Sequence, residues 1–247
     1  MKNALFKKLL FLLLFFIQIA QPQKISTSIF NKIHEACYDL DINKLTELIG
    51  SKKDTTIKKY LILLKNPEKY TVVQSAVFGV IKKINIALKN LTTYKDLLKH
   101  LNTIIINFDK ILEFIRKKTE NMKLSVAKRS LSGTSYLNGD DKTITFNIYL
   151  FNHQDISIKS PIANLIENFT LIVKRYKSEI KIHQQSTEIK TLLNKLLKLF
   201  IVRLLDNGGS IKTRNAGSKT NLEIIMEQED ISFSRWELDK YPGYSDI

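Results

Sequence analysis

Hydrophobic residues recur at intervals of three and four along most of this chain, which is the pattern of amphipathic helices. The clearest stripe runs from Tyr94 to Ile115, with polar residues between its members. A second stripe follows Pro161, a favoured first residue of helices, and continues to Ile180. A third spans residues 189–204. Each predicted helix has one apolar face, so we expect these helices to pack against one another.

The segment between the first and second stripes has a different pattern. Residues 132–141 are rich in Gly, Ser, Asn and Asp, and they contain Asn138-Gly139, a strong turn signal. Residues 143–151 are β-branched and aromatic with partial alternation. That pattern fits either a short strand or an apolar helical turn, and the sequence does not separate the two.

These patterns predict five regions along the chain. We expect a signal peptide at 1–20, an N-terminal helical region at 21–118, a linker or loop at 119–141, a C-terminal helical region at 142–231 and a C-terminal tail at 232–247.

One stretch of the C-terminal region combines several turn and helix-end signals. The leucine pair 204–205 ends the third predicted helix, Gly208 follows it, and the aliphatic Ile211 precedes a Lys-Thr-x-Leu sequence at 219–222. This order resembles the second helix of one ankyrin repeat continuing into the next repeat, with a hairpin that projects outward between them. Gly208 is expected to adopt the left-handed conformation that closes a helix. The hydroxyl of Thr220 is expected to cap the helix that follows.

The resemblance extends to the terminal segments of the chain only. Residues 33–50 are similar to the two helices of one repeat, with Leu40 in place of the usual glycine between them, and residues 71–79 give a fainter match. Asn221 and Glu223 stand where the family prefers Pro and His. We therefore expect a mostly α fold, with helical hairpins stacked as a degenerate ankyrin-like solenoid or as an irregular helical bundle.

The first twenty residues resemble a targeting segment rather than part of a domain. Three lysines precede an unbroken apolar run at 9–17, and a small residue and Pro22 follow. This order is typical of a secretory signal peptide, and the run is short for a transmembrane helix. The sequence predicts export across the membrane, to a secreted or periplasmic location, with an uncleaved N-terminal anchor as the alternative.

Composition adds a strongly basic charge to this picture. The 247 residues include 39 Lys or Arg and 24 Asp or Glu, a formal net charge of +15. Lysine is far more frequent than arginine, and the lysines are spread along the sequence, which favours a solvated basic surface over a nucleic-acid reader. A salt-sensitive attraction to anionic surfaces follows from the charge in either case.

The sequence contains no pattern typical of a catalytic or metal site. Its four histidines are far apart, and Cys37 is the single cysteine, so we expect no disulfide, no metal site and no cofactor. The neighbours of Cys37 favour a buried, inert thiol. No enzymatic activity and no small-molecule substrate are expected.

These observations favour a non-enzymatic module that binds another protein, such as a host or envelope protein, through ankyrin-like helical repeats. The alternative is a basic helical protein that binds membrane, envelope polymer or nucleic acid electrostatically. For the first function, the sequence predicts partner contacts at the projecting turn, whose side chains are expected to point away from the core. The four predicted contact residues are Ser210, Lys212, Arg214 and Asn215.

Overall fold

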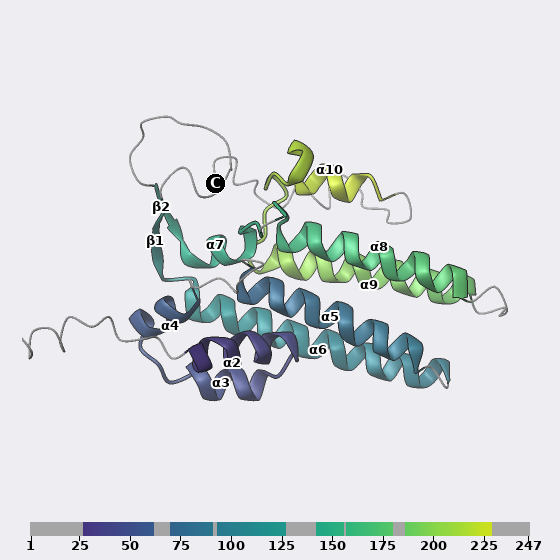
Figure 1. The fold of residues 1–247 in the computed structure, drawn as a ribbon, viewed down its shortest axis with the longest axis horizontal. Helices are drawn as coiled ribbons and strands as arrows, with labels where there is room; N and C mark the ends of the chain where they lie inside the picture. The colour runs from purple at the N-terminus through teal and green to yellow at the C-terminus, as the bar shows by residue number, and fades with distance from the viewer. Residues whose placement is uncertain are drawn as a thin grey trace, which may run out of the picture.

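The computed structural model describes residues 27–61, 70–90, 93–126, 142–155, 157–179 and 186–228. Within these ranges the fold is mostly helical (Figure 1). The predicted signal peptide and C-terminal tail lie outside the described residues. The elements in chain order are α2 (Thr27–Tyr38), α3 (Ile42–Ile49), α4 (Asp54–Leu61), α5 (Val72–Lys89), α6 (Tyr94–Thr119), β1 (Lys123–Val126), β2 (Lys142–Thr145), α7 (Phe146–Asn152), α8 (Pro161–Glu179), α9 (Ser186–Asp206), a short 3-10 helix (Ala216–Ser218) and α10 (Asn221–Met226).

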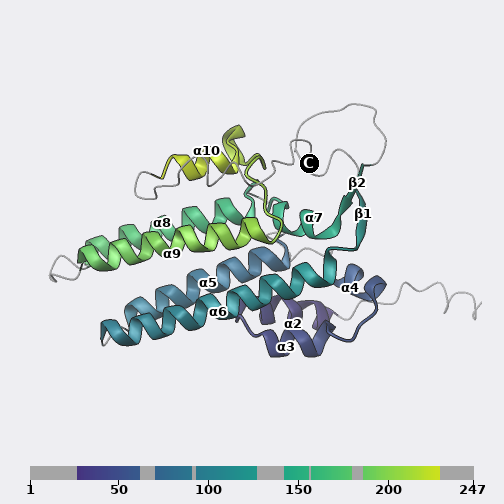
Figure 2. The ribbon, with the colours of Figure 1, turned by 180° about the vertical axis from the view of Figure 1, so that it is seen from behind.

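Four long helices, α5, α6, α8 and α9, form the centre of the molecule and lie side by side in both views (Figures 1 and 2). Three of them, α6, α8 and α9, are the helices predicted from the hydrophobic stripes, and their existence and approximate bounds are confirmed. Their apolar faces meet in one core. The ring of Phe200 on α9 lies between Phe108 on α6 and Phe169 on α8, with centroid separations of 5.4 and 6.5 Å.

Helix α2 covers one side of α5, and α3 packs against α2 and α6. The crossing of α2 with α5 is so close that a Cβ atom at Gly79 would overlap the carbonyl oxygen of Tyr38. Cys37 and Ile33 are fully buried at this interface. The turn between α2 and α3 places Leu40 at φ 53°, a left-handed conformation that favours glycine, at the position where the sequence showed leucine in place of glycine.

The start of α5 connects both halves of the chain. Thr71 caps the helix, its hydroxyl accepting from the Gln74 amide at 3.3 Å, and the Gln74 side chain accepts from the Thr71 amide at 2.8 Å. The same two residues reach across the fold. The Thr71 hydroxyl donates to the Leu150 carbonyl of α7 at 3.1 Å, and the Gln74 amide group donates to the Lys159 carbonyl at 2.9 Å. Helix α5 therefore packs against elements of both predicted helical regions.

The ambiguous segment 143–151 contains a strand and a helix in succession. Strand β2 pairs antiparallel with β1 in the register Lys123↔Thr145, and α7 starts at the next residue. Both interpretations of the pattern were therefore correct for part of the segment. Strand β1 occupies 123–126 of the predicted linker, and the predicted Asn-Gly turn lies outside the described residues.

Candidate functional site

The connection between α9 and α10 has the local structure that its turn signals predicted. Gly208 has φ +121°, and its amide donates to the Leu205 carbonyl at 3.1 Å. The next amide, that of Gly209, donates to the Leu204 carbonyl at 2.9 Å. Helix α9 thus ends in the glycine-dependent turn expected after paired leucines.

The chain then forms a tight hairpin before α10. An antiparallel bridge joins Arg214 to Thr220, and the Asn215 amide donates to the Lys219 carbonyl at 2.7 Å. At the tip, Gly217 has φ 74°. We call residues 207–220 the hairpin loop. Backbone hydrogen bonds join its two arms directly, so the loop does not rely on contacts with α10 alone for its shape.

Thr220 ends the hairpin loop and caps α10, as predicted. Its hydroxyl accepts from the Glu223 amide at 3.2 Å, while its own amide donates to the Glu223 carboxylate at 2.6 Å. The Thr220 backbone N–H, followed by its hydroxyl, lowers the pKa of Glu223. Glu223 occupies the position where the ankyrin pattern has histidine, and its carboxylate completes a reciprocal capping box.

Buried asparagine side chains hold the hairpin loop against α7. Asn152, the last residue of α7, donates to the Gly208 carbonyl at 2.8 Å. Its Oδ1 atom accepts from the Ser210 amide at 2.7 Å and from the Thr213 hydroxyl at 2.9 Å. One side chain, only 3% exposed, therefore satisfies three groups of the loop.

A second group of polar side chains ties the hairpin loop to the start of α8. The Asn215 Oδ1 atom accepts from the Ser160 amide, and Asn221 Oδ1 accepts from the Ser160 hydroxyl, each at 2.7 Å. Asn215 also donates to Asn221 at 2.8 Å, and Asn221 donates to the Ser210 carbonyl at 2.7 Å. Together with Asn152, these residues form what we call the asparagine network, which joins α7, α8, α10 and the hairpin loop.

The structure divides the four predicted contact residues into two pairs. Lys212 and Arg214 are exposed, as predicted. The prediction that all four side chains point outward is wrong for Ser210 and Asn215, which are 1% and 5% exposed. The Asn215 side chain bonds within the asparagine network. The Ser210 backbone bonds to Asn152 and Asn221, while its hydroxyl accepts from the Lys212 amide at 3.2 Å, because small polar side chains in a turn can satisfy backbone groups as well as face water.

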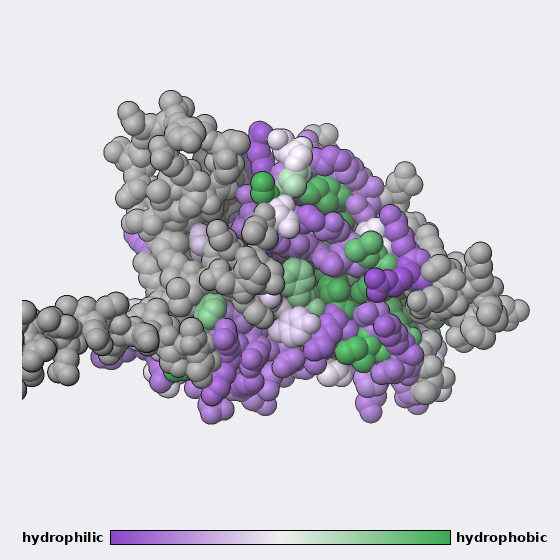
Figure 3. Space-filling model, in the orientation of Figure 1, coloured by the Kyte–Doolittle hydropathy of each residue, from purple (hydrophilic) through white to green (hydrophobic). Residues whose placement is uncertain are grey.

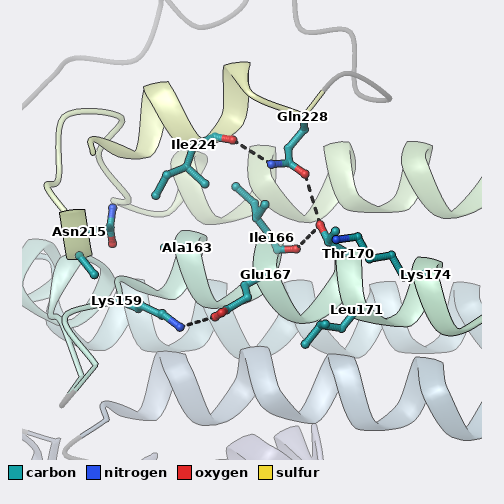
Figure 4. A pocket seen from close by; sticks show the side chains of 11 residues that line it. Lys159, Ala163, Ile166, Glu167, Thr170, Leu171, Lys174, Asn215, Ile224 and Gln228 are labelled. Carbon is teal, nitrogen blue, oxygen red and sulfur yellow. Dashed lines mark hydrogen bonds and ion pairs between the residues drawn. The ribbon is translucent and has the colours of Figure 1, made fainter. Parts of the chain in front are cut away.

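A groove lies between α8 and the C-terminal segment that contains the hairpin loop and α10 (Figure 4). Its volume is about 420 Å³. Apolar side chains of α8 and α10 form part of the wall, and lysines, a glutamate and amide side chains form the rest. The lining residues are Lys159, Ala163, Ile166, Glu167, Thr170, Leu171, Lys174, Asn215, Ala216, Ile224 and Gln228.

Charges in the groove are only partly neutralised within it. The Lys159 ammonium lies 2.5 Å from the Glu167 carboxylate. Lys174 is exposed and forms no ion pair with any residue in the described part of the chain. Gln228 bridges the two walls, accepting from the Thr170 hydroxyl at 3.3 Å and donating to the Ile224 carbonyl at 3.2 Å. The groove therefore combines apolar surface with a net positive rim.

No sequence pattern predicted the asparagine network or the groove. Pro161 was recognised as a helix start, and the polar residue immediately before it, Ser160, was the available signal for a cap. The hydroxyl of Ser160 does accept from the Ala163 amide at 3.2 Å. No pattern in the neighbouring sequence identifies Asn152 as part of the network, because its partners in the hairpin loop lie more than fifty residues away in the sequence.

The remaining chemically interesting side chains lie at the α2–α5 interface. Burial raises the pKa of the Cys37 thiol to about 12, so the thiol is protonated at neutral pH. This confirms the prediction that Cys37 is buried. His34 Nδ1 lies 2.6 Å from the Ser75 hydroxyl, and both side chains are buried. In the described ranges, no group of His, Cys, Asp or Glu is arranged to hold a metal ion.

Comparisons with known protein families, with curated proteins and with solved structures give no match. A search of the described residues finds no helix with the length and apolar character needed to span a bilayer. The features of this chain that bear on its function are the hairpin loop, the groove and the distribution of charge.

Proposed function

We propose that this protein is a non-enzymatic binding module that holds an acidic segment of another protein on the hairpin loop and the adjoining groove. The observation that carries the proposal is the division of the loop into two sets of side chains. Ser210 and Asn215 are buried in the asparagine network, whereas Lys212 and Arg214 are exposed on the same short turn. A loop fixed in this way presents its cations on an ordered backbone, so little backbone entropy is left to lose on binding.

The chemistry of the groove supports a partner of this kind. Lys174 lines the same groove as the apolar side chains of Ile166 and Ile224, and the exposed Leu171 lies one turn before it on α8 (Figure 4). A peptide that carries carboxylates together with an aliphatic side chain would match both features. Hydrophobic side chains are interspersed with a larger hydrophilic area on this face of the molecule (Figure 3).

The resemblance to ankyrin repeats supports the same class of function. The left-handed Gly208, the hairpin that follows it and the capping Thr220 agree with the resemblance at the C-terminal segment. Leu40, in a glycine-like conformation between two short helices, agrees with it at the N-terminal segment. If these segments are ankyrin-like, helices α6 and α8, at 26 and 19 residues, are long helical insertions between them. Export of the module remains a proposal that depends on residues 1–20.

A selection from a displayed library of random peptides tests the proposal. Peptides retained by the full chain at moderate salt are expected to be rich in Asp and Glu and to contain an aliphatic residue. Reversal of both loop charges, Lys212→Glu with Arg214→Glu, is expected to weaken their binding tenfold or more. The physical reason is that two attractive charges become repulsive at the contact.

The matched control reverses Lys52 and Lys53 to glutamate, since both are exposed and lie in the turn before α4. This variant has the same net charge as the loop variant, and it should bind selected peptides as the parent does. The proposal fails if the library yields no acidic peptides, or if the control and loop variants lose binding equally. A circular dichroism spectrum like that of the parent shows that each variant is folded.

A further inference from the structure

Positive charge is concentrated at one end of the four-helix centre. The C-terminal ends of α5 and α8 and the N-terminal ends of α6 and α9 meet there, on the side away from α7 in both ribbon views (Figures 1 and 2). We call the described side chains of 82–104 and 171–196 the basic end. It carries nine cations, namely Lys82, Lys83, Lys89, Lys95, Lys99, Lys174, Arg175, Lys190 and Lys195. Its carboxylates are Asp96 and Glu188.

The rest of the described surface is close to electrically neutral. Outside the basic end, the described side chains include fifteen Lys or Arg and thirteen Asp or Glu. The surplus of positive charge in the described structure therefore lies mainly at this one end. Seven of its nine cationic side chains are exposed, and Lys83 and Lys190 are half-buried. Such a concentration raises the local potential far more than the same charges spread over the surface.

Two exposed aliphatic side chains accompany these cations. Ile86 on α5 is 46% exposed, and Leu171 on α8 is 52% exposed. The hydrogen bond from Gln74 to the Lys159 carbonyl aligns the starts of α5 and α8. Ile86 lies twelve residues after Gln74, and Leu171 lies twelve residues after Lys159. Both therefore lie at a similar level, roughly 18 Å beyond that hydrogen bond in the direction of the helices. In Figure 4, Leu171 points toward α5.

We propose that the basic end binds the surface of an anionic phospholipid bilayer, with Ile86 and Leu171 at the level of the headgroups. Eight of the nine cations are lysines, whose compact charges suit headgroups held in a fluid layer. Each lysine near such a surface strengthens binding about fivefold. Nucleic-acid binding favours arginine forks and exposed aromatic rings, whereas this end offers aliphatic side chains.

Vesicle co-sedimentation of the full chain tests the proposal. The probe is a vesicle of phosphatidylglycerol mixed with phosphatidylcholine, compared with phosphatidylcholine alone at the same salt concentration. Stronger binding to the anionic vesicles is expected, with a steep loss as salt rises. The variant Lys89→Glu, Lys95→Glu, Lys99→Glu is expected to lower the affinity at least tenfold. The pair Ile86→Ser and Leu171→Ser is expected to lower it several-fold, with no change in its salt dependence.

The matched control is Lys52→Glu, Lys53→Glu, Lys110→Glu, which changes net charge equally with exposed lysines outside the basic end. It should lower affinity much less than the variant at the basic end. Equal losses in both variants would overturn the proposal, because the attraction would then come from net charge alone. Equal binding to both kinds of vesicle would also overturn it. So would binding of a short DNA duplex that depends on the same lysines while anionic vesicles are not bound.

Discussion

The side chain of Asn152 and the backbone of Ser210 lie 58 residues apart in the sequence, yet the Ser210 amide donates a 2.7 Å hydrogen bond to Asn152 Oδ1. Both groups are buried. This contact fixes the start of the hairpin loop on the end of α7. It explains why a loop with two exposed cations has a defined conformation, and it makes Asn152 the residue on which the proposed binding surface most depends.

Replacement of Asn152 by alanine is expected to destabilise the fold by about 2–4 kcal/mol, because the Gly208 carbonyl, the Ser210 amide and the Thr213 hydroxyl lose their partner. Urea unfolding monitored by circular dichroism measures this cost. The control is Asn168→Ala, which removes one hydrogen bond to the carbonyl of Asn164 within α8. The control should cost less than about 1 kcal/mol. Equal costs would show that the asparagine network does not contribute as described.

The close crossing of α2 and α5 predicts an unusual response at Gly79. Alanine is ordinarily the better residue inside a helix by about 1 kcal/mol. Here the added Cβ would overlap the Tyr38 carbonyl oxygen, so Gly79→Ala is expected to lower stability by about 2 kcal/mol or more.

A position can require glycine because a Cβ atom would clash or because its φ is positive, and a comparison with Gly217 separates these two causes. A Cβ at Gly217 meets no atom within 4 Å, and only its φ of 74° opposes alanine. Gly217→Ala should therefore cost about 1 kcal/mol. Thermal unfolding of both variants gives the comparison, and a milder effect at Gly79 than at Gly217 would contradict the described packing.

Thr71 and Thr220, which cap α5 and α10, predict a graded pair of effects. Thr220→Ala removes the cap of the short helix α10 and should cost about 1 kcal/mol. Thr71→Ala removes a cap and also the hydrogen bond to the Leu150 carbonyl of α7, so it should cost about 2–3 kcal/mol. Denaturant midpoints of the two variants rank them. The reverse order would mean that the contact between α5 and α7 contributes little.

Burial of Cys37 predicts a pH dependence of stability. The thiol has a pKa of about 12 in the folded chain, against an ordinary value of 9.0. Above pH 9 the unfolded chain ionises while the folded chain does not, so the thiol's contribution to stability is complete below pH 9. It falls by about 1.4 kcal/mol per pH unit until the pH reaches about 12. The difference in free energy of unfolding between the parent and Cys37→Ala isolates this effect from other titrating groups.

The same burial predicts the reactivity of the thiol. Iodoacetamide at pH 8 should label Cys37 slowly in the folded chain and rapidly in urea, since the thiolate is the reactive species. Equal labelling rates in the two conditions would contradict burial.

Local sequence patterns predicted much of the secondary structure. The stripes located α6, α8 and α9, and Gly208 and Thr220 were assigned their roles correctly, because helix formation and capping depend on residues three or four positions apart. Residues 143–151 were ambiguous for a physical reason. The first residues pair with a strand about twenty positions earlier, and the remainder forms a helix against the core, so no single period describes them.

The candidate site was predicted less completely. Lys212 and Arg214 are exposed as expected, but Ser210 and Asn215 are buried. The sequence around a polar residue in a turn is the same whether its side chain faces water or a buried backbone group. Only the packing of α7 and α8 against the loop determines which of the two occurs. The groove likewise depends on where α10 lies against α8, which no local pattern encodes.

Local patterns and composition are enough to show that this chain forms amphipathic helices, where several of them begin and end, and that it is strongly basic. These properties follow from neighbouring residues and from composition. The tertiary structure decided which polar side chains are buried and where the charge collects. Lysines spread along the sequence come together at one end of the molecule because two antiparallel hairpins, α5 with α6 and α8 with α9, lie side by side in the same direction, which places residues 82–104 beside 171–196.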